Sequence, residues 1–174
     1  MRNITLGLLI TTAILSSGCA SYQLGNRTLY RNDIATVSVP VFQSESLRRF
    51  LGERLTEAVI KEIELKTPYK VANGRNAHSR LTGRIIHDAK YAITENRNDE
   101  LRDIELELFA EVAWQDRNGN SLLAPQRVAI PRALHRVGQA VHFVPEGGQS
   151  LTTAQQDAIE RLATQIVAMM ELPW

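Results

Sequence analysis

The sequence lacks a second cysteine to pair with Cys19, which is its only one. No disulfide bond can form within the chain, so a packed apolar core has to hold the fold. An excess of either charge is also missing, because 20 lysine and arginine residues face 19 aspartate and glutamate residues. This balance excludes a global field that would draw the protein onto nucleic acid or an anionic membrane. Contact with a polyanion would need a local cluster of cations.

Signature motifs of common enzymes are absent as well. The sequence contains no Gly-x-Ser-x-Gly, no Gly-x-x-x-x-Gly-Lys and no Gly-x-Gly-x-x-Gly, so a hydrolase elbow and a phosphate-binding loop have no support. The carboxylates of Glu105, Glu107 and Glu111 lie on the polar face of one predicted strand, where charges usually meet water. We predict a protein that is not an enzyme and has no cofactor.

The histidines do not show the spacing of a metal site, in which two ligands often lie four residues apart on a helix. They are His78, His87, His135 and His142. His135 and His142 fall in one predicted loop, and a weak metal site there is the alternative. We predict that the protein binds no metal.

An uncharged apolar run follows Arg2 and extends over residues 4–15. At about 12 residues it is too short to span a bilayer of about 30 Å and is typical of a secretory signal peptide. Small residues then lead to Cys19, as in the lipobox at which bacterial lipoproteins are cleaved and acylated, although Ser16 stands where an aliphatic residue is usual. We predict a signal peptide over residues 1–18 and a diacylglycerol on Cys19. A secreted protein with an incidental thiol is the alternative.

Ala20 bears on the membrane in which the anchor would lie. Lipoproteins that stay on the inner membrane typically have aspartate after the acylated cysteine in well-studied bacteria, so Ala20 predicts the outer membrane, on its periplasmic side. A multiply acylated cysteine would anchor the protein without help from charge, since each buried CH₂ contributes about 0.8 kcal/mol. Polar residues 19–33 are predicted to form a tether, and residues 34–174 a single domain.

Hydrophobic periodicity predicts the elements of this domain. Alternating or short apolar runs predict strands over residues 34–42, 81–87, 103–114 and 121–130, and residues 69–72 are predicted to be a short extended piece. Apolar stripes with steps of three and four predict two helices. One helix would start after caps at residues 44–46, bury Leu47 and Phe50, and end at Thr67-Pro68; the other would cover residues 150–171. The predicted fold is a two-layer α+β sandwich, with a mostly antiparallel sheet of about four strands and both helices on one face.

Residues 131–148 show no period and are predicted to form a loop. A local basic cluster, Arg127, Arg132 and Arg136 with His135, overlaps its start. Arginine forks pair well with phosphate, so these three arginines are candidates for contact with a phosphorylated lipid. A solvated loop is the alternative.

Several segments resemble the lipopolysaccharide-assembly lipoproteins of the LptE type. They are residues 22–25 (YQLG), 36–42 (TVSVPVF), 51–58 (LGERLTEA), 80–85 (RLTGRI) and the closing stretch 158–174. The resemblance implies a small sheet with two helices on one face. It also implies a lipoprotein that plugs a large outer-membrane β-barrel, helps this barrel assemble, and contacts lipopolysaccharide on its way to the cell surface.

The expected partners are therefore the barrel, lipopolysaccharide and the outer membrane, with no nucleic acid. The arginine cluster would be the lipopolysaccharide-binding candidate, and Cys19 is the only functional residue that the resemblance carries over. An envelope lipoprotein that assists assembly of a secretion pore or surface appendage is the alternative function.

Overall fold

The computed structural model describes residues 29–74, 76–95, 101–123 and 134–172. Most of the predicted tether lies outside these residues, together with the signal peptide, Cys19, Arg127 and Arg132. The described strands are β1 (Thr36–Ser38), β2 (Gln43–Ser44), β3 (Lys70–Val71), β4 (Ser79–Glu95), β5 (Leu101–Asp116) and β6 (His135–Phe143). The helices are α2 (Leu51–Lys66), the short 3₁₀ turn η2 (Pro145–Gly147) and α3 (Leu151–Ala168).

The sheet is mixed and has six strands, in the order β3-β1-β4-β5-β6, with β2 also paired to β4. The predicted α+β class is correct, but the prediction of a mostly antiparallel sheet of about four strands is wrong. Strands β4, β5 and β6 pair antiparallel, whereas β1, β2 and β3 pair parallel to their neighbours. The parallel pairs arise because α2 carries the chain back across the sheet before β3, as a crossover helix does.

The predicted strand over residues 34–42 is interrupted. β1 ends at Ser38, and Pro40, which has no N–H group to donate, lies in the gap before β2. By contrast, the predicted strand over residues 81–87 is only the middle of β4. Residues 88–95, which complete β4, mix polar and apolar side chains without a clean alternation, so the sequence does not mark them as a strand.

Residues 131–148 are not a single loop, because they contain β6. The described part of the predicted strand over residues 121–130 forms only a bridge between Ser121 and Gln115. β6 takes its place beside β5, with Ile104 opposite Phe143 and Val112 opposite His135. The alternation of buried and exposed residues along β6 fails in its middle, around Gly138, which explains why the sequence does not show the strand.

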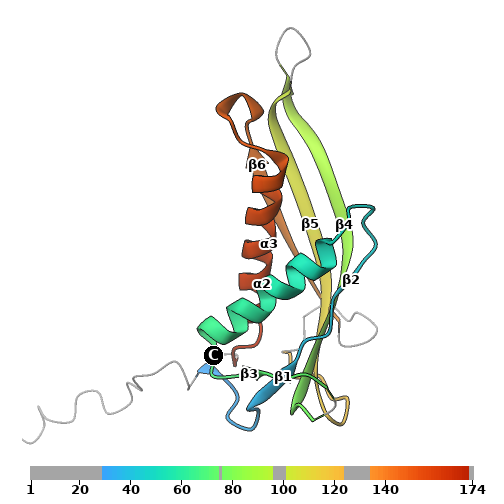
Figure 1. The fold of residues 1–174 in the computed structure, drawn as a ribbon, viewed down its shortest axis with the longest axis vertical. Coiled ribbons are helices and arrows are strands. Elements are labelled where there is room, and N and C mark those ends of the chain that lie inside the picture. The colour runs from blue at the N-terminus through green and yellow to red at the C-terminus, as the bar shows by residue number, and fades with distance from the viewer. Residues whose placement is uncertain (1–28, 75, 96–100, 124–133, 173–174) are drawn as a thin grey trace, which may run out of the picture.

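Both helices lie on the same face of the sheet, as predicted, and α3 packs against β5, β6 and α2 (Figure 1). α3 begins at the predicted cap, where the Ser150 side chain accepts a hydrogen bond from the backbone of Thr153. α2 begins at Leu51, later than predicted. Leu47 and Phe50 are therefore not part of its buried stripe.

The core forms between the helices and the apolar face of β5. Ile104, Leu106, Leu108, Ala110, Val112 and Trp114 are all buried, which confirms the face predicted from their alternation. α3 contributes a matching stripe of buried residues, among them Ala158, Leu162 and Ile166. Because the apolar residues of β5 and α3 recur with a strict period, the sequence predicts the buried face of each element.

Phe42 joins α2 to β4 through two glycines. A Cβ on Gly52, in the first turn of α2, would lie 2.2 Å from the Phe42 carbonyl oxygen. A Cβ on Gly83, in β4, would lie 2.6 Å from the Phe42 ring. The backbone N–H of Phe42 also donates to the Thr56 hydroxyl at 2.8 Å, and this hydroxyl donates to the Gly52 carbonyl at 2.7 Å. Segments 36–42, 51–58 and 80–85 therefore meet at one point.

The two ends of the described domain meet at its base. The Leu172 N–H donates to the Leu29 carbonyl at 2.8 Å, and the Tyr30 hydroxyl donates to Glu171 at 3.3 Å. Burial, followed by the negative charge of Glu171, raises the pKa of Tyr30 to about 12. The Tyr69 ring contacts the Tyr30 ring, with centroids 5.7 Å apart. Leu29 and Tyr30, which lie within the predicted tether, are thus fixed at the base of the folded domain.

We predict that Gly52→Ala lowers the free energy of unfolding. In an open helix this change stabilises by about 1 kcal/mol, but here the new methyl group meets the Phe42 carbonyl, and overpacking costs about 1–3 kcal/mol. Urea denaturation measures the difference, with Glu57→Ala on the exposed side of α2 as the control, expected within about 0.5 kcal/mol of the wild type. A Gly52→Ala variant more stable than the wild type would contradict the packing described here.

Candidate functional site

The open face of the sheet, which we define as the side of β4, β5 and β6 turned away from the helices, carries the one described arginine of the predicted cluster. Arg136 lies there on β6, opposite Glu111 of β5, which in turn lies opposite Arg84 of β4. The Arg84 and Arg136 guanidinium groups approach the Glu111 carboxylate to 3.1 and 3.2 Å. Hydrogen bonds from Arg84 and then Arg136 hold the pKa of Glu111 below its usual value of 4.5. Arg136 is thus an ion-paired strand residue and not part of a solvated loop.

Two histidines pair with the other carboxylates of the open face. His142 Nε2 lies 2.9 Å from Glu105, and its Nδ1 lies 3.5 Å from Asp103. His87 Nε2 lies 3.6 Å from Glu107. The carboxylates that the sequence places on a wet face do lie there, but each faces a basic side chain across the strands. The sequence could not show this pairing because it depends on the register of β4 and β6.

Small residues and one aromatic ring fill the middle of the open face. Phe109 lies opposite Gly138, and a Cβ on this glycine would come within 2.2 Å of the ring. The ring also contacts His87, with centroids 5.7 Å apart. The Phe109 ring therefore packs directly on the backbone of Gly138, where a larger residue would clash with it. The same glycine breaks the alternation of β6.

His135 does not share a surface with Arg136. It is buried and lies opposite Val112, on the helix side of β6, whereas His142 lies opposite Glu105 on the open face. The alternative of a metal site at His135 and His142 is therefore wrong. Among the described residues, no group of three histidine, cysteine, aspartate or glutamate side chains is placed to hold a metal ion.

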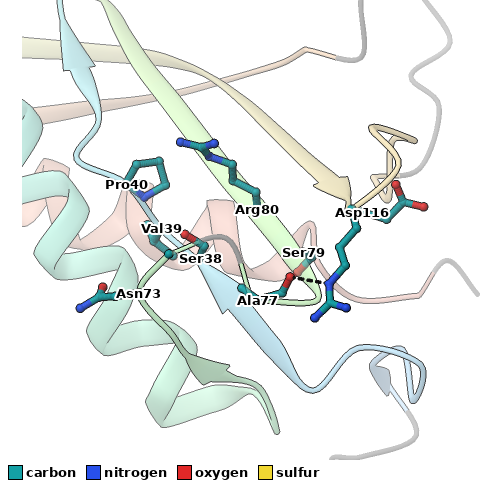
Figure 2. Close-up of a pocket in the computed structure, with 10 residues that line it drawn as sticks. Ser38, Val39, Pro40, Asn73, Ala77, Ser79, Arg80 and Asp116 are labelled. Atoms are coloured by element: carbon teal, nitrogen blue, oxygen red, sulfur yellow. Dashed lines mark hydrogen bonds between the residues drawn. The ribbon is translucent and has the colours of Figure 1, made fainter.

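A cavity of about 690 Å³ opens between β1, the start of β4 and the turn that follows β5 (Figure 2). The Arg117 guanidinium donates to the carbonyls of Ala77 and Asn76, at 2.9 and 2.6 Å. Arg80 extends toward Pro40 on the other side (Figure 2). Arg80 and Arg117, the two cations that line this cavity, thus lie on different walls. They do not converge on one point, as a phosphate site would require.

The Asp116 carboxylate, which lines the same cavity, is hydrogen-bonded to the turn that follows it. It accepts hydrogen bonds from the backbone of Asn118 and Asn120 and from the Asn120 side chain. These bonds, the one from the Asn120 side chain first, lower the pKa of Asp116. Asp116 therefore stabilises the turn formed by Asn118, Gly119 and Asn120.

In the part of the chain that the structure describes, neither helix has the length and apolar character needed to cross a membrane. The predicted lipid attachment site and two of the three candidate arginines lie outside that part. The described site is therefore a surface, a strand face whose carboxylates lie beside arginine or histidine side chains of neighbouring strands.

An α+β domain with two helices on one face of a six-stranded mixed sheet is the class that this fold defines. Residues 34–170 match the LptE family, described as lipopolysaccharide-assembly, and the chain belongs to this family. Among curated proteins, none matches the chain.

Solved structures of low sequence identity are similar to the chain. The PelC dodecamer from Paraburkholderia phytofirmans has 11% identity and a TM-score of 0.51, over 84% of this chain and 93% of that one. The hypothetical protein CT253 from Chlamydia trachomatis has 10% identity and a TM-score of 0.52, over 78% and 94%. Uncharacterized lipoprotein B from Nitrosomonas europaea has 15% identity and a TM-score of 0.49, over 85% and 91%. At such identities the similarity concerns the fold alone.

Proposed function

We propose that the protein is an outer-membrane lipoprotein that assembles with and plugs a lipopolysaccharide-transporting β-barrel, and so assists delivery of lipopolysaccharide to the cell surface. The observation that carries this proposal is the family match over residues 34–170, nearly the whole described domain. A role in lipopolysaccharide assembly belongs to the family as such. The plug, the acylated Cys19 and the periplasmic side of the membrane are our proposals for this chain.

The geometry of the base supports an anchor at Cys19. Leu29 lies at the base beside the C-terminal end of the described chain, and the β4–β5 hairpin extends to the opposite end of the domain (Figure 1). About ten residues separate Cys19 from Leu29, and they span at most about 36 Å. An acylated Cys19 would therefore keep Leu29 within about 36 Å of the membrane.

The charges of the open face support a binding role without catalysis. Its carboxylates face arginine or histidine side chains of neighbouring strands. General acid–base catalysis needs a group that is poised for proton transfer in reach of a substrate. We therefore propose a non-enzymatic partner of the barrel, and family membership favours this function over assembly of a secretion pore or appendage.

Recovery of the partner from membranes tests the proposed function. We expect affinity purification of the wild-type chain from solubilised outer membranes to recover the lipopolysaccharide-transporting barrel. Cys19→Ala should move a large share of the chain to the soluble fraction, because the acyl chains supply the membrane affinity. Recovery of a secretin in place of the barrel would support the alternative function. A Cys19→Ala variant that stays in the outer membrane even in cells depleted of the barrel would contradict the anchor.

We also propose that Arg127, Arg132 and Arg136 contact the phosphates of lipopolysaccharide. Replacing all three with serine should weaken lipopolysaccharide binding several-fold at low salt, and the difference should shrink as ionic strength rises. The fold should persist, because Arg84 still pairs with Glu111 when Arg136 is absent. A variant with Arg49, Lys61 and Arg161 changed to serine removes the same charge from the helix side and serves as the control. Wild-type binding by the folded triple arginine variant at low salt would remove these residues from the mechanism.

A further inference from the structure

The C-terminal half of β4, residues 86–95, which we call its upper half, is an edge of the sheet. β2 pairs with β4 only at Arg84 and Ile85, and the last hydrogen bond on this side joins the Glu45 N–H to the Ile85 carbonyl. From residue 86 to Glu95, β4 pairs with β5 alone among the strands that the structure describes. Alternate N–H and C=O groups along such an edge are free to pair with another extended chain.

A regular stretch of this edge is long enough for a further strand. The register between β4 and β5 shifts between Ile85 and His87 and again between Ala92 and Thr94. Residues 87–92 between these irregularities pair without interruption. Typical strands have about 5–6 residues, so this stretch matches the length of one added strand.

Exposed apolar side chains also lie on this part of β4 and in the segment that precedes α2. Leu47 and Phe50, in the segment between β2 and α2, have relative exposures of 102% and 68%. Tyr91 and Ile93 on the upper half of β4 are 45% and 48% exposed. We call these four residues the edge patch. Leu47 lines a pocket together with residues 86–88 of β4, and Tyr91, which lies opposite Glu105, belongs to the open face of the same strand. Exposed apolar side chains on both sides of one strand edge favour an interaction site.

The segment that carries Leu47 and Phe50 is held in place. Ser46 Oγ donates to Asp88 Oδ2 at 2.7 Å, and Arg48 Nε lies 3.1 Å from the same oxygen. The Asp88 side chain is only 3% exposed, so this ion pair is shielded on the β4 side. Phe50 has a φ of 60°, in the left-handed region that a non-glycine residue rarely adopts. The fold thus fixes two exposed apolar side chains beside an edge of β4 that no other described strand covers.

We propose that residues 87–92 of β4 and the edge patch bind an extended segment of the barrel, which adds to the sheet as a further strand. The identity of this partner rests on the proposed function. An extended chain is the occupant that fits, because only such a chain pairs with a row of backbone groups while its alternate side chains contact the patch. A second copy fits less well, since antiparallel pairing of two β4 edges about residue 90 would bring two Lys90 side chains close together.

Amide hydrogen exchange tests strand addition directly. The full chain is measured alone and in its purified complex with the barrel, at single-residue resolution over residues 86–95. We expect the amides of alternate residues in this range to exchange at least tenfold more slowly in the complex. This inference would be overturned if the barrel is recovered in the complex but the amides of residues 86–95 exchange as fast as in the free chain. That result would leave the proposed function intact. If the barrel is not recovered at all, the proposed function and this inference both fail.

Charge substitutions test the edge patch. Leu47→Glu combined with Ile93→Glu should lower the affinity for the purified barrel at least tenfold, because both carboxylates would be buried against the incoming strand. Leu65→Glu, at a side chain that is 73% exposed on α2 and away from the edge, is the matched control and should leave the affinity unchanged. Circular dichroism and the Tm of each variant establish that it is folded.

Two results would assign the edge to another occupant and overturn the proposal. One is slow exchange of residues 86–95 in the chain alone, together with the mass of a dimer, which would indicate a second copy. The other is loss of binding to vesicles of phosphatidylethanolamine and phosphatidylglycerol in the Leu47→Glu and Ile93→Glu variant, with unchanged affinity for the barrel, which would indicate a membrane contact.

Discussion

Phe42 can pack against α2 and β4 together only because Gly52 and Gly83 both lack a side chain. The Phe42 carbonyl lies against Gly52 and the Phe42 ring against Gly83, and the Thr56 hydroxyl accepts a hydrogen bond from the Phe42 backbone N–H. The start of α2, and with it the direction in which the helix crosses the sheet, depends on this contact. So does the segment between β2 and α2, which has to leave the sheet after Ser44 and reach Leu51 within a few residues. The exposed positions of Leu47 and Phe50 follow from this short path.

Elements with a strict period could be predicted from the sequence, and elements without one could not. The alternation of Ile104 through Trp114 and the stripe of α3 predicted both their type and their buried face. The upper half of β4 and all of β6 lack such a period. Gly138 seats the Phe109 ring, so the residue that breaks the pattern of β6 is required by a neighbour that is distant in sequence. Parallel pairing of β1 and β3 is equally hidden, because periodicity indicates a strand but not the direction of its partner.

The candidate site was predictable only in its residue types. The glutamates of one predicted strand indicate a polar face, and the structure confirms that Glu105, Glu107 and Glu111 share it. Which base each carboxylate meets depends on the register of three strands. Arg136 illustrates the difference: the sequence places it in a loop with His135, and the structure places the two side chains on opposite faces of β6. Glu111 is ion-paired with Arg84 and Arg136, whereas Glu105 and Glu107 lie beside histidines, which carry a charge only when they are protonated.

Membership of the LptE family supports a role in lipopolysaccharide assembly, and a scaffold for lipopolysaccharide transport is the role that we propose for this chain. The most direct test of this account is the amount of lipopolysaccharide at the cell surface after depletion of the protein. The account predicts that surface lipopolysaccharide falls while lipopolysaccharide accumulates inside the cell, and that expression of the wild-type chain restores transport. Normal surface lipopolysaccharide in fully depleted cells, with loss of a secretion pore or surface appendage, would contradict it.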